Sequence, residues 1–315
     1  MSQTTSTAPR RGAAEPTSPA PKRASTPARR RTDPIYYFFL FPALALFTLA
    51  VTLPAIVGFG YSFTNSIGFG DWEFIGLRNY IAVFRDQGIL GAYGFTLGFS
   101  LVTVIIVNLI AFALALGLTS RIRFQAALRT IFVLPMVISG IIIAFVFKFL
   151  FANTLPAVAQ ALGIDALSSS ILANESLAWV GIVIVTAWST IPSTMLIYIA
   201  GLVTVPSDLY EAAAIDGASP VKKLWHVTLP LVSGYVVINT ILGFKNYLNA
   251  YDIVVGLTDG GPGTATRTVA MSIFKGFEGG DYGYQMANAA VFFVISIVIA
   301  VVQLRLTRGK ATFGA

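Results

Sequence analysis

Six long segments of this chain contain no Asp, Glu, Lys or Arg, although charged residues border each one. A helix needs about 20 consecutive apolar residues to cross the core of a bilayer, and an ionised side chain there is costly. Each uncharged segment therefore predicts one membrane-spanning helix. The segments lie between Asp33 and Asp71, Asp86 and Arg121, Arg129 and Lys148, Glu175 and Asp208, Lys223 and Lys245, and Asp281 and Arg305. The helices predicted within them cover roughly residues 35–60, 94–118, 129–151, 177–204, 228–250 and 285–305.

A seventh apolar segment, residues 149–164, does not meet the same requirement. It is short, and Asn153 and Pro156 interrupt it. We expect an interfacial or re-entrant segment here rather than another membrane-spanning helix. The fold class predicted from the whole pattern is an all-α integral membrane protein with six transmembrane helices.

The composition agrees with a membrane protein and excludes several classes of site. Hydrophobic residues make up 56% of the 315 residues, charged residues make up 11%, and the mean hydropathy is +0.76. These values exclude an ordinary soluble enzyme. The absence of Cys rules out disulfides and thiolate chemistry, and the single histidine, His226, cannot form a histidine metal cluster. We therefore expect no metal site.

The basic residues are distributed as in a membrane protein, although a net charge of +7 alone would also suit a nucleic-acid-binding protein. Seven Lys and Arg residues lie in the N-terminal tail, three in the loop 119–129, two in the loop 205–227 and three at the C-terminal end. The loops between these carry two, none and two. Because cytoplasmic segments carry the excess of Lys and Arg, both termini are predicted to be cytoplasmic, and we expect no nucleic-acid partner.

Residues 1–33 are rich in Pro, Ser, Thr, Ala and Arg and contain no hydrophobic run. Such a composition cannot bury enough apolar surface to fold, so we expect a disordered basic tail in the cytoplasm. Binding of Arg29, Arg30 and Arg31 to anionic membrane lipid is an open alternative. Residues 34–315 are then expected to form one transmembrane domain.

The motifs of several enzyme classes are absent from the chain. No G-x-x-x-x-G-K-[ST] phosphate loop, H-E-x-x-H zinc motif or G-x-S-x-G nucleophile elbow occurs. No Asp or Glu lies within the predicted helices, whereas proton- and sodium-coupled carriers typically use buried carboxylates. We therefore expect no enzyme activity, no catalytic residue and no bound cofactor, and a helical pore whose energy comes from another protein.

The loop 205–228, between the fourth and fifth predicted spans, contains the signals of two short helices. Ser207 or Asp208 can cap the first helix, and Gly217 is expected to end it. Ser219 and Pro220 provide an N-cap and a first-turn proline for the second helix. The loop is thus predicted to form a helical elbow on the cytoplasmic face, although these residues alone are also compatible with a simple connector.

The first helix of this elbow offers a surface suited to another protein, because three consecutive alanines permit close approach and Glu211 supplies one charge. The run from Glu211 to Gly217, followed after eleven residues by Leu229-Pro230, resembles the EAA loop of bacterial ABC importer permeases. The resemblance implies that the elbow is a coupling helix that docks onto an ATPase subunit. The coupling residues that it implies are Glu211, Ala212, Ala213, Asp216 and Gly217.

Two further blocks resemble the sugar-type permeases that are related to the maltose and glycerol-phosphate systems. The first block contains Phe74, Gly76, Leu77, Asn79 and Tyr80 and ends at Asp86. The second contains Tyr251, Asp252, Leu257, Thr258, Gly260, Gly261, Pro262, Thr266, Tyr282, Gly283, Tyr284 and Ala287. The similarity covers nearly all of the chain from residue 34 onward and implies the type I ABC importer permease fold. The large outer-loop insertions of the maltose permease are absent.

The resemblance also implies partners and a cellular location. It implies a second, similar permease subunit, two ATPase subunits that bind ATP and magnesium, and an extracellular solute-binding protein that delivers a carbohydrate. The chain itself would bind no cofactor and would lie as a multi-pass protein in the plasma membrane of a bacterium, in contact with lipid. The alternative is a secondary carrier or facilitator for a small polar solute that works alone.

Polar residues on two predicted spans are candidates for the substrate path, because such residues face the bundle or a water-filled cavity. Their spacing of i, i+3, i+4 and i+7 places each set on one face of its helix. The candidates are Thr186, Ser189, Thr190 and Ser193 in the fourth span and Gly243, Asn246, Tyr247 and Ala250 in the fifth. The alternative is hydrogen bonding between helices, which small hydroxyl residues commonly provide. Lys245 borders the second set and can either snorkel to the interface or contact an anionic group.

Overall fold

The computed structural model describes residues 34–120 and 122–307, so the predicted disordered tail and its arginines lie outside the described residues. Over these ranges the protein is helical, with one isolated bridge between Thr64 and Phe74. Its contacts divide it into two units, residues 1–53 and 54–315, which are described separately. Six described helices are long and apolar enough to cross a membrane, which confirms the predicted fold class. They are Ile35–Tyr61, Gln87–Thr119, Gly140–Ala161, Ala178–Val203, Pro220–Leu248 and Tyr282–Leu306.

The first unit contains α1 (Pro34–Phe47) and a π turn at Thr48–Thr52, after which α2 (Leu53–Tyr61) continues the helix into the second unit. The run PIYYFFLFPALALF carries no charged residue, as expected for a helix surrounded by hydrocarbon.

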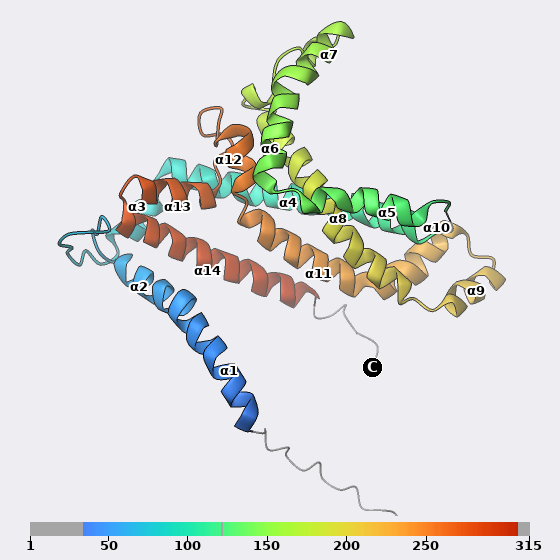
Figure 1. Cartoon of the computed structure of the whole chain (residues 1–315), viewed down its shortest axis with the longest axis horizontal. Helices are drawn as coiled ribbons and strands as arrows, with labels where there is room; N and C mark the ends of the chain where they lie inside the picture. Colours follow the sequence, from blue (N-terminus) through green and yellow to red (C-terminus); the bar gives the residue numbers. More distant parts are fainter. Residues whose placement is uncertain (1–33, 121, 308–315) are drawn as a thin grey trace, which may run out of the picture. The chain divides into compact units, whose positions relative to one another are not determined.

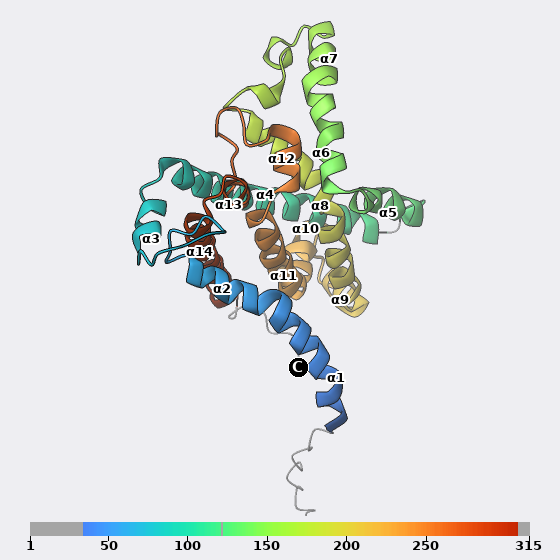
Figure 2. The ribbon, with the colours of Figure 1, turned by 60° about the vertical axis from the view of Figure 1, so that its left-hand side comes forward.

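Three helices form the centre of the second unit: α4 (Gln87–Thr119), α8 (Ala178–Val203) and α11 (Leu229–Leu248) pack against one another (Figures 1 and 2). Small residues permit this packing, since Ala111 and Ala115 are completely buried. At Gly201 a Cβ atom would lie 2.5 Å from the ring of Tyr235, so α8 and α11 could not approach as closely with any other residue there.

The remaining helices of the second unit surround this centre. Near the start of α4, α14 (Tyr282–Thr307) packs against α3 (Arg78–Val83) and α13 (Val269–Glu278). Farther along the chain, α12 (Asp252–Thr258) packs against α6 (Gly140–Phe149), and a Cβ atom on Gly256 would lie 2.5 Å from that of Ala144. Figure 1 shows α3 and α13 at one end of this unit and α9 and α10 at the other.

The boundaries predicted for the third span, residues 129–151, are wrong. Residues 125–133 form α5, and a 3₁₀ turn at Leu134–Val137 then interrupts the helix. The apolar helix begins again at Gly140 and continues through α6, a π turn at Leu150–Thr154 and α7 (Leu155–Ala161). The segment expected to be interfacial is therefore the second half of this helix, and Asn153 and Pro156 do not break it. The helix is interrupted instead at the Leu134-Pro135 step, which lies in the 3₁₀ turn.

The π turns explain why Pro156 is tolerated. Three π turns occur in the described residues, and each is followed by a Leu-Pro step: Leu53-Pro54, Leu155-Pro156 and Leu229-Pro230. In each case the leucine N–H donates to the carbonyl five residues earlier. Proline has no N–H and its ring collides with the preceding turn of a regular α-helix, so a wider turn relieves both problems. Pro42 and Pro192 lie within regular α-helix, so proline alone does not impose a π turn.

Three other predicted spans begin later than the observed helices, the sixth by only three residues. α4 begins at Gln87 rather than residue 94, because the Asp86 carboxylate accepts hydrogen bonds from the backbone N–H groups of Gly88 and Ile89 and caps the helix. The fifth helix begins at Pro220 rather than residue 228, since α10 (Pro220–Lys223) and a π turn at Leu224–Thr228 run directly into α11.

Candidate functional site

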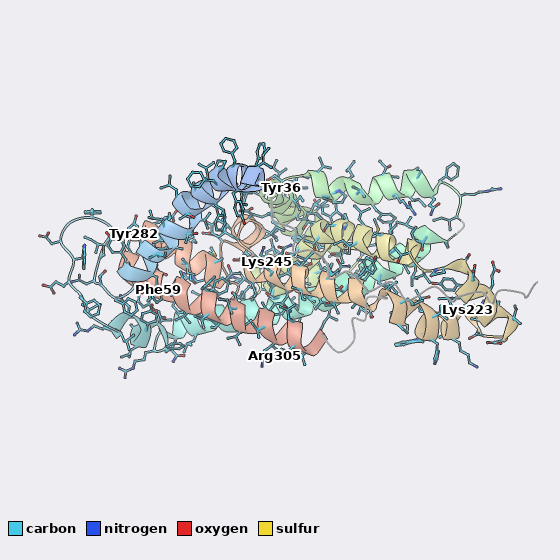
Figure 3. All side chains as sticks on the ribbon, turned by 90° about the horizontal axis from the view of Figure 1, so that it is seen from below. Tyr36, Phe59, Lys223, Lys245, Tyr282 and Arg305 are labelled. Atoms are coloured by element: carbon cyan, nitrogen blue, oxygen red, sulfur yellow. The ribbon has the colours of Figure 1, made fainter. Side chains whose placement is uncertain are left out.

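The elbow predicted in the loop 205–228 is present as two helices, α9 (Ser207–Ile215) and α10 (Pro220–Lys223). Lys223, labelled in Figure 3, marks the point where the elbow joins the continuous helix that carries Lys245 near its other end. The second helix of the elbow, α10, is therefore the first part of the fifth membrane helix, and α9 directly precedes it in the chain.

Gly217 ends α9 as expected, in a left-handed conformation with φ of +70°. The N–H of Ala218 donates to the carbonyl of Ala213 at 2.9 Å, and the N–H of Gly217 donates to that of Ala214 at 3.1 Å. These two bonds form a Schellman motif, in which glycine avoids the strain that a Cβ atom would cause. The sharp turn between α9 and α10 depends on this glycine.

The caps of the elbow agree with the prediction at one helix and differ at the other. The Ser219 hydroxyl accepts a hydrogen bond from the Lys222 N–H, and Pro220 occupies the first turn of α10. At α9, however, Pro206 occupies the N-cap position and no side chain caps the helix. Ser207 and Asp208 are the first two residues of α9, so the predicted cap is wrong by one or two positions.

The surface of the elbow is open. Glu211, Ala212, Asp216 and Gly217 are exposed, and Ala213 is half-buried. Ile215, although hydrophobic, is 87% exposed.

Tyr210 anchors the elbow and was not recognised in the sequence. Its hydroxyl lies 2.9 Å from Oγ1 of Thr228, a buried residue at the start of α11. The Tyr210 side chain thus joins α9 to the base of the fifth membrane helix. The only sequence signal for this role is that Tyr210 and Glu211, as consecutive residues of a helix, point in different directions. This spacing does not identify Thr228 as the partner of Tyr210.

Within the membrane helices, the candidates Thr190 of α8 and Tyr247 of α11 meet. The Thr190 hydroxyl donates to the Thr186 carbonyl at 2.7 Å, so the Tyr247 hydroxyl, 3.0 Å away, donates to Thr190. Tyr247 is only 3% exposed, and its ring packs edge-on against Phe99. The pair therefore connects two helices, and Thr190 is the partly exposed residue of the two.

The other candidates of α8 are not brought together with α11. Ser189 and Ser193 donate to carbonyls of their own helix and remain partly exposed. Thr186 is 4% exposed, and its hydroxyl has no hydrogen-bond partner among the described residues.

The other candidates of the fifth predicted span differ in burial. A Cβ atom on Gly243 would lie 3.4 Å from the Tyr247 ring, so this glycine faces the core. Ala250 packs against the same core, and its carbonyl accepts a hydrogen bond from Thr268. Asn246 is exposed, as is the neighbouring Lys245. Gly243, Asn246 and Tyr247 keep the predicted helical spacing within α11, whereas Ala250 lies beyond the last residue of that helix.

The blocks that carry the sugar-permease resemblance have structural roles at the end of the second unit opposite the elbow. Thr266 donates to the Gly261 carbonyl at 2.7 Å and lies 2.8 Å from the Thr258 hydroxyl. Asn79 donates to the carbonyls of Ser62 and Thr64. These residues hold two loops in shape.

Charged residues of both signs lie at the same end. Lys275 forms a 2.7 Å salt bridge with Asp259, the one ion pair within the part of the chain that the structure describes. Burial, together with the carboxylates of Glu278, Asp252 and Asp259, raises the pKa of Tyr251, so this phenol stays protonated at physiological pH and can donate a hydrogen bond. The described residues contain no group of three His, Asp or Glu that could hold a metal ion.

The sequence of this chain is similar to those of known proteins. A family described as "Binding-protein-dependent transport system inner membrane component" matches residues 107–311. The probable starch degradation products transport system permease protein AmyD of Thermoanaerobacterium thermosulfurigenes is 32% identical over 276 residues, which cover 87% of this chain and 94% of AmyD. The multiple sugar-binding transport system permease protein MsmF of Streptococcus mutans is 32% identical over 272 residues, covering 86% and 94%.

Solved structures share the fold. A chain of a bacterial ABC transporter involved in import of the acidic polysaccharide alginate matches with a TM-score of 0.78 and 19% identity, covering 88% of this chain and 96% of that one. The same transporter in complex with its pentasaccharide-bound periplasmic protein gives 0.78 and 20%. Together with six apolar helices, the family match and the relatives lead to one assignment. The chain belongs to the binding-protein-dependent transport system inner membrane components and is a multi-pass plasma-membrane permease subunit of an ABC importer.

Proposed function

We propose that this permease subunit translocates a carbohydrate that an extracellular solute-binding protein delivers. The support is the substrate class in the names of relatives such as AmyD and MsmF, and the periplasmic protein bound to the alginate transporter. The chain performs no chemistry on the sugar. A stand-alone carrier is not favoured, because the six membrane helices contain no Asp or Glu that could couple transport to protons or sodium.

In this proposal the elbow receives force from an ATPase subunit. The observation that carries it is the continuous helix from Pro220 to Leu248, which extends from the elbow to Tyr247. The Tyr210–Thr228 contact joins α9 to the same helix. A displacement of α9 therefore moves the base of α11, and a rigid helix transmits the motion to the Thr190–Tyr247 pair. Two ATPase subunits would supply ATP hydrolysis, and ATP and magnesium would be bound there.

A second, similar permease subunit would complete the path. Thr190, Ser189 and Ser193 offer partly exposed hydroxyls that can exchange hydrogen bonds with sugar hydroxyls. The opposite wall would come from the second permease, since one subunit cannot enclose them. The proposed orientation has both termini in the cytoplasm, as the distribution of Lys and Arg indicates.

Cysteine cross-linking tests the coupling role directly, because the natural chain has no Cys. In the assembled importer, Ala212→Cys in α9 should cross-link to an ATPase subunit through a short bis-maleimide. Leu162→Cys, an exposed site directly after α7, is the matched control and should not. Cross-links to the ATPase from Leu162→Cys but none from Ala212→Cys would disprove the coupling role of the elbow.

A further inference from the structure

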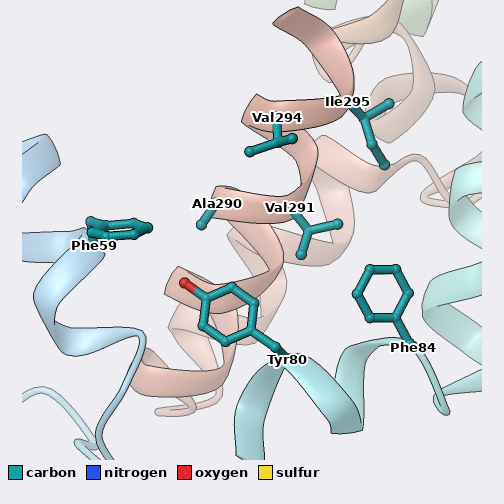
Figure 4. Close-up of a pocket in the computed structure, with 7 residues that line it drawn as sticks. All are labelled: Phe59, Tyr80, Phe84, Ala290, Val291, Val294 and Ile295. Atoms are coloured by element: carbon teal, nitrogen blue, oxygen red, sulfur yellow. The ribbon is translucent and has the colours of Figure 1, made fainter. Parts of the chain in front are cut away.

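An apolar groove lies at the end of the second unit opposite the elbow, between α2, α3 and α14 (Figure 4). Its volume is about 340 Å³, within the range of small-molecule sites. The lining residues are Phe59, Tyr80, Phe84, Ala290, Val291, Val294 and Ile295. The one polar side-chain group among them, the Tyr80 hydroxyl, already lies 2.6 Å from the Ser62 hydroxyl. The groove therefore offers carbon atoms alone to an occupant.

The groove lies beside the middle of α14. Ala290 and Ile295 lie 8 and 13 residues after Tyr282, the first residue of α14, which corresponds to roughly 12 and 20 Å along the helix. Because α14 is long and apolar enough to cross a membrane, we expect an occupant of the groove to meet hydrocarbon, and an acyl chain matches the chemistry of the lining.

Two exposed arginines, Arg78 and Arg85, belong to the same segment as the lining residues Tyr80 and Phe84. Arg78 begins α3 and Arg85 follows Phe84, both are exposed, and neither forms a salt bridge among the described residues. The neighbouring Asp86 carboxylate is occupied by the N–H groups of Gly88 and Ile89 and by the Tyr284 hydroxyl. A guanidinium binds phosphate oxygens in a bidentate manner, so the arginines complement an anionic headgroup.

From this arrangement we infer that the groove is a binding site for an anionic phospholipid, with an acyl chain between α2 and α14 and the phosphate at Arg85 and Arg78. In the proposed orientation this lipid belongs to the outer leaflet. The site differs from the sugar path and from the elbow, and its lipid fixes α3 against α14 at the end that faces the binding protein.

The test uses the assembled importer in nanodiscs that contain phosphatidylglycerol with a photoreactive acyl chain. Illumination should label the peptides that carry Phe59, Phe84 and Val294. Ala290→Phe, which fills the groove, should abolish the labelling. The control variant is Leu109→Phe, which introduces the same ring in α4 at a residue that is 68% exposed and lies outside the groove. This variant should leave the labelling unchanged.

A second variant tests the headgroup and does not depend on repacking. Arg85→Gln alters an exposed side chain and should lower the preference for phosphatidylglycerol over phosphatidylcholine by about fivefold. The inference is overturned if labelling of the groove persists in Ala290→Phe, if Arg85→Gln retains the full preference, or if photoreactive residues in the groove cross-link to the second permease instead of lipid.

Discussion

At the scale of single residues, Tyr247 carries the strongest link between the two helices of the proposed path. Its hydroxyl donates to Thr190, while its ring is buried against Phe99. Truncation to alanine would remove the ring as well and cost about 3–5 kcal/mol of packing, which would confuse transport with folding. The informative change is therefore Tyr247→Phe, which removes the hydroxyl alone.

We predict that Tyr247→Phe lowers sugar uptake several-fold while the complex assembles normally. The expected loss of stability is small, about 0.6 kcal/mol for one hydrogen bond between membrane helices. Uptake in proteoliposomes and the yield of purified complex provide the two measurements. Normal uptake in Tyr247→Phe and also in Thr190→Val would place the sugar path on another face of these helices.

Glu211 is the residue whose charge the elbow offers to a partner, since it is exposed in the middle of α9. We predict that Glu211→Lys abolishes uptake and releases the ATPase subunits during purification, because the reversed charge repels a basic partner surface. Glu175→Lys, the same change at an exposed residue outside the elbow, should have neither effect. Equal ATPase recovery in both variants, with normal uptake, would contradict the prediction.

At the scale of elements, the shape of the elbow depends on one left-handed residue. Gly217 and Gly163 share a φ of +70°, and neither has an atom within 4 Å of the position of a Cβ. Alanine at either site costs about 1–2 kcal/mol of backbone strain. We predict that Gly217→Ala reduces ATP-dependent uptake and that Gly163→Ala, with the same strain after α7, does not. Equal uptake in both variants would mean that the geometry of the α9–α10 turn is unimportant for coupling.

The element scale also shows what the sequence could predict. Long uncharged stretches identify six helices, because the cost of burying charge acts on every residue of a span. They do not fix where a helix begins, since α4, which Asp86 caps, begins seven residues before the predicted start. They also misplace the third span, where the 3₁₀ turn at Leu134–Val137 interrupts the helix and a π turn accommodates Pro156.

The sequence predicts the elbow of the candidate site better than the contacts between its membrane helices. Gly217, Ser219 and Pro220 act through local backbone geometry, so their positions in the elbow follow from the sequence. The Thr190–Tyr247 contact depends on how α8 and α11 rotate about their axes, which is decided by packing against α4 rather than by local sequence. The same rotation leaves Asn246 exposed.

At the scale of the whole molecule, the chain has the parts of a path and of a coupling device but no source of energy. The phosphate loop of an ATPase is absent, and no described membrane helix contains a carboxylate. Partly exposed hydroxyls on α8 also need a facing surface to enclose a sugar. Transport is therefore expected of the assembled importer and not of this subunit alone.

The most direct measurement is sugar uptake by liposomes that hold either this subunit alone or the complete assembly with the second permease, the ATPase subunits and the binding protein. The complete assembly should accumulate sugar only with ATP, and its ATPase activity should rise with liganded binding protein. Liposomes with this subunit alone should show no flux. Sugar-specific flux through this subunit alone, without ATP, would contradict the account.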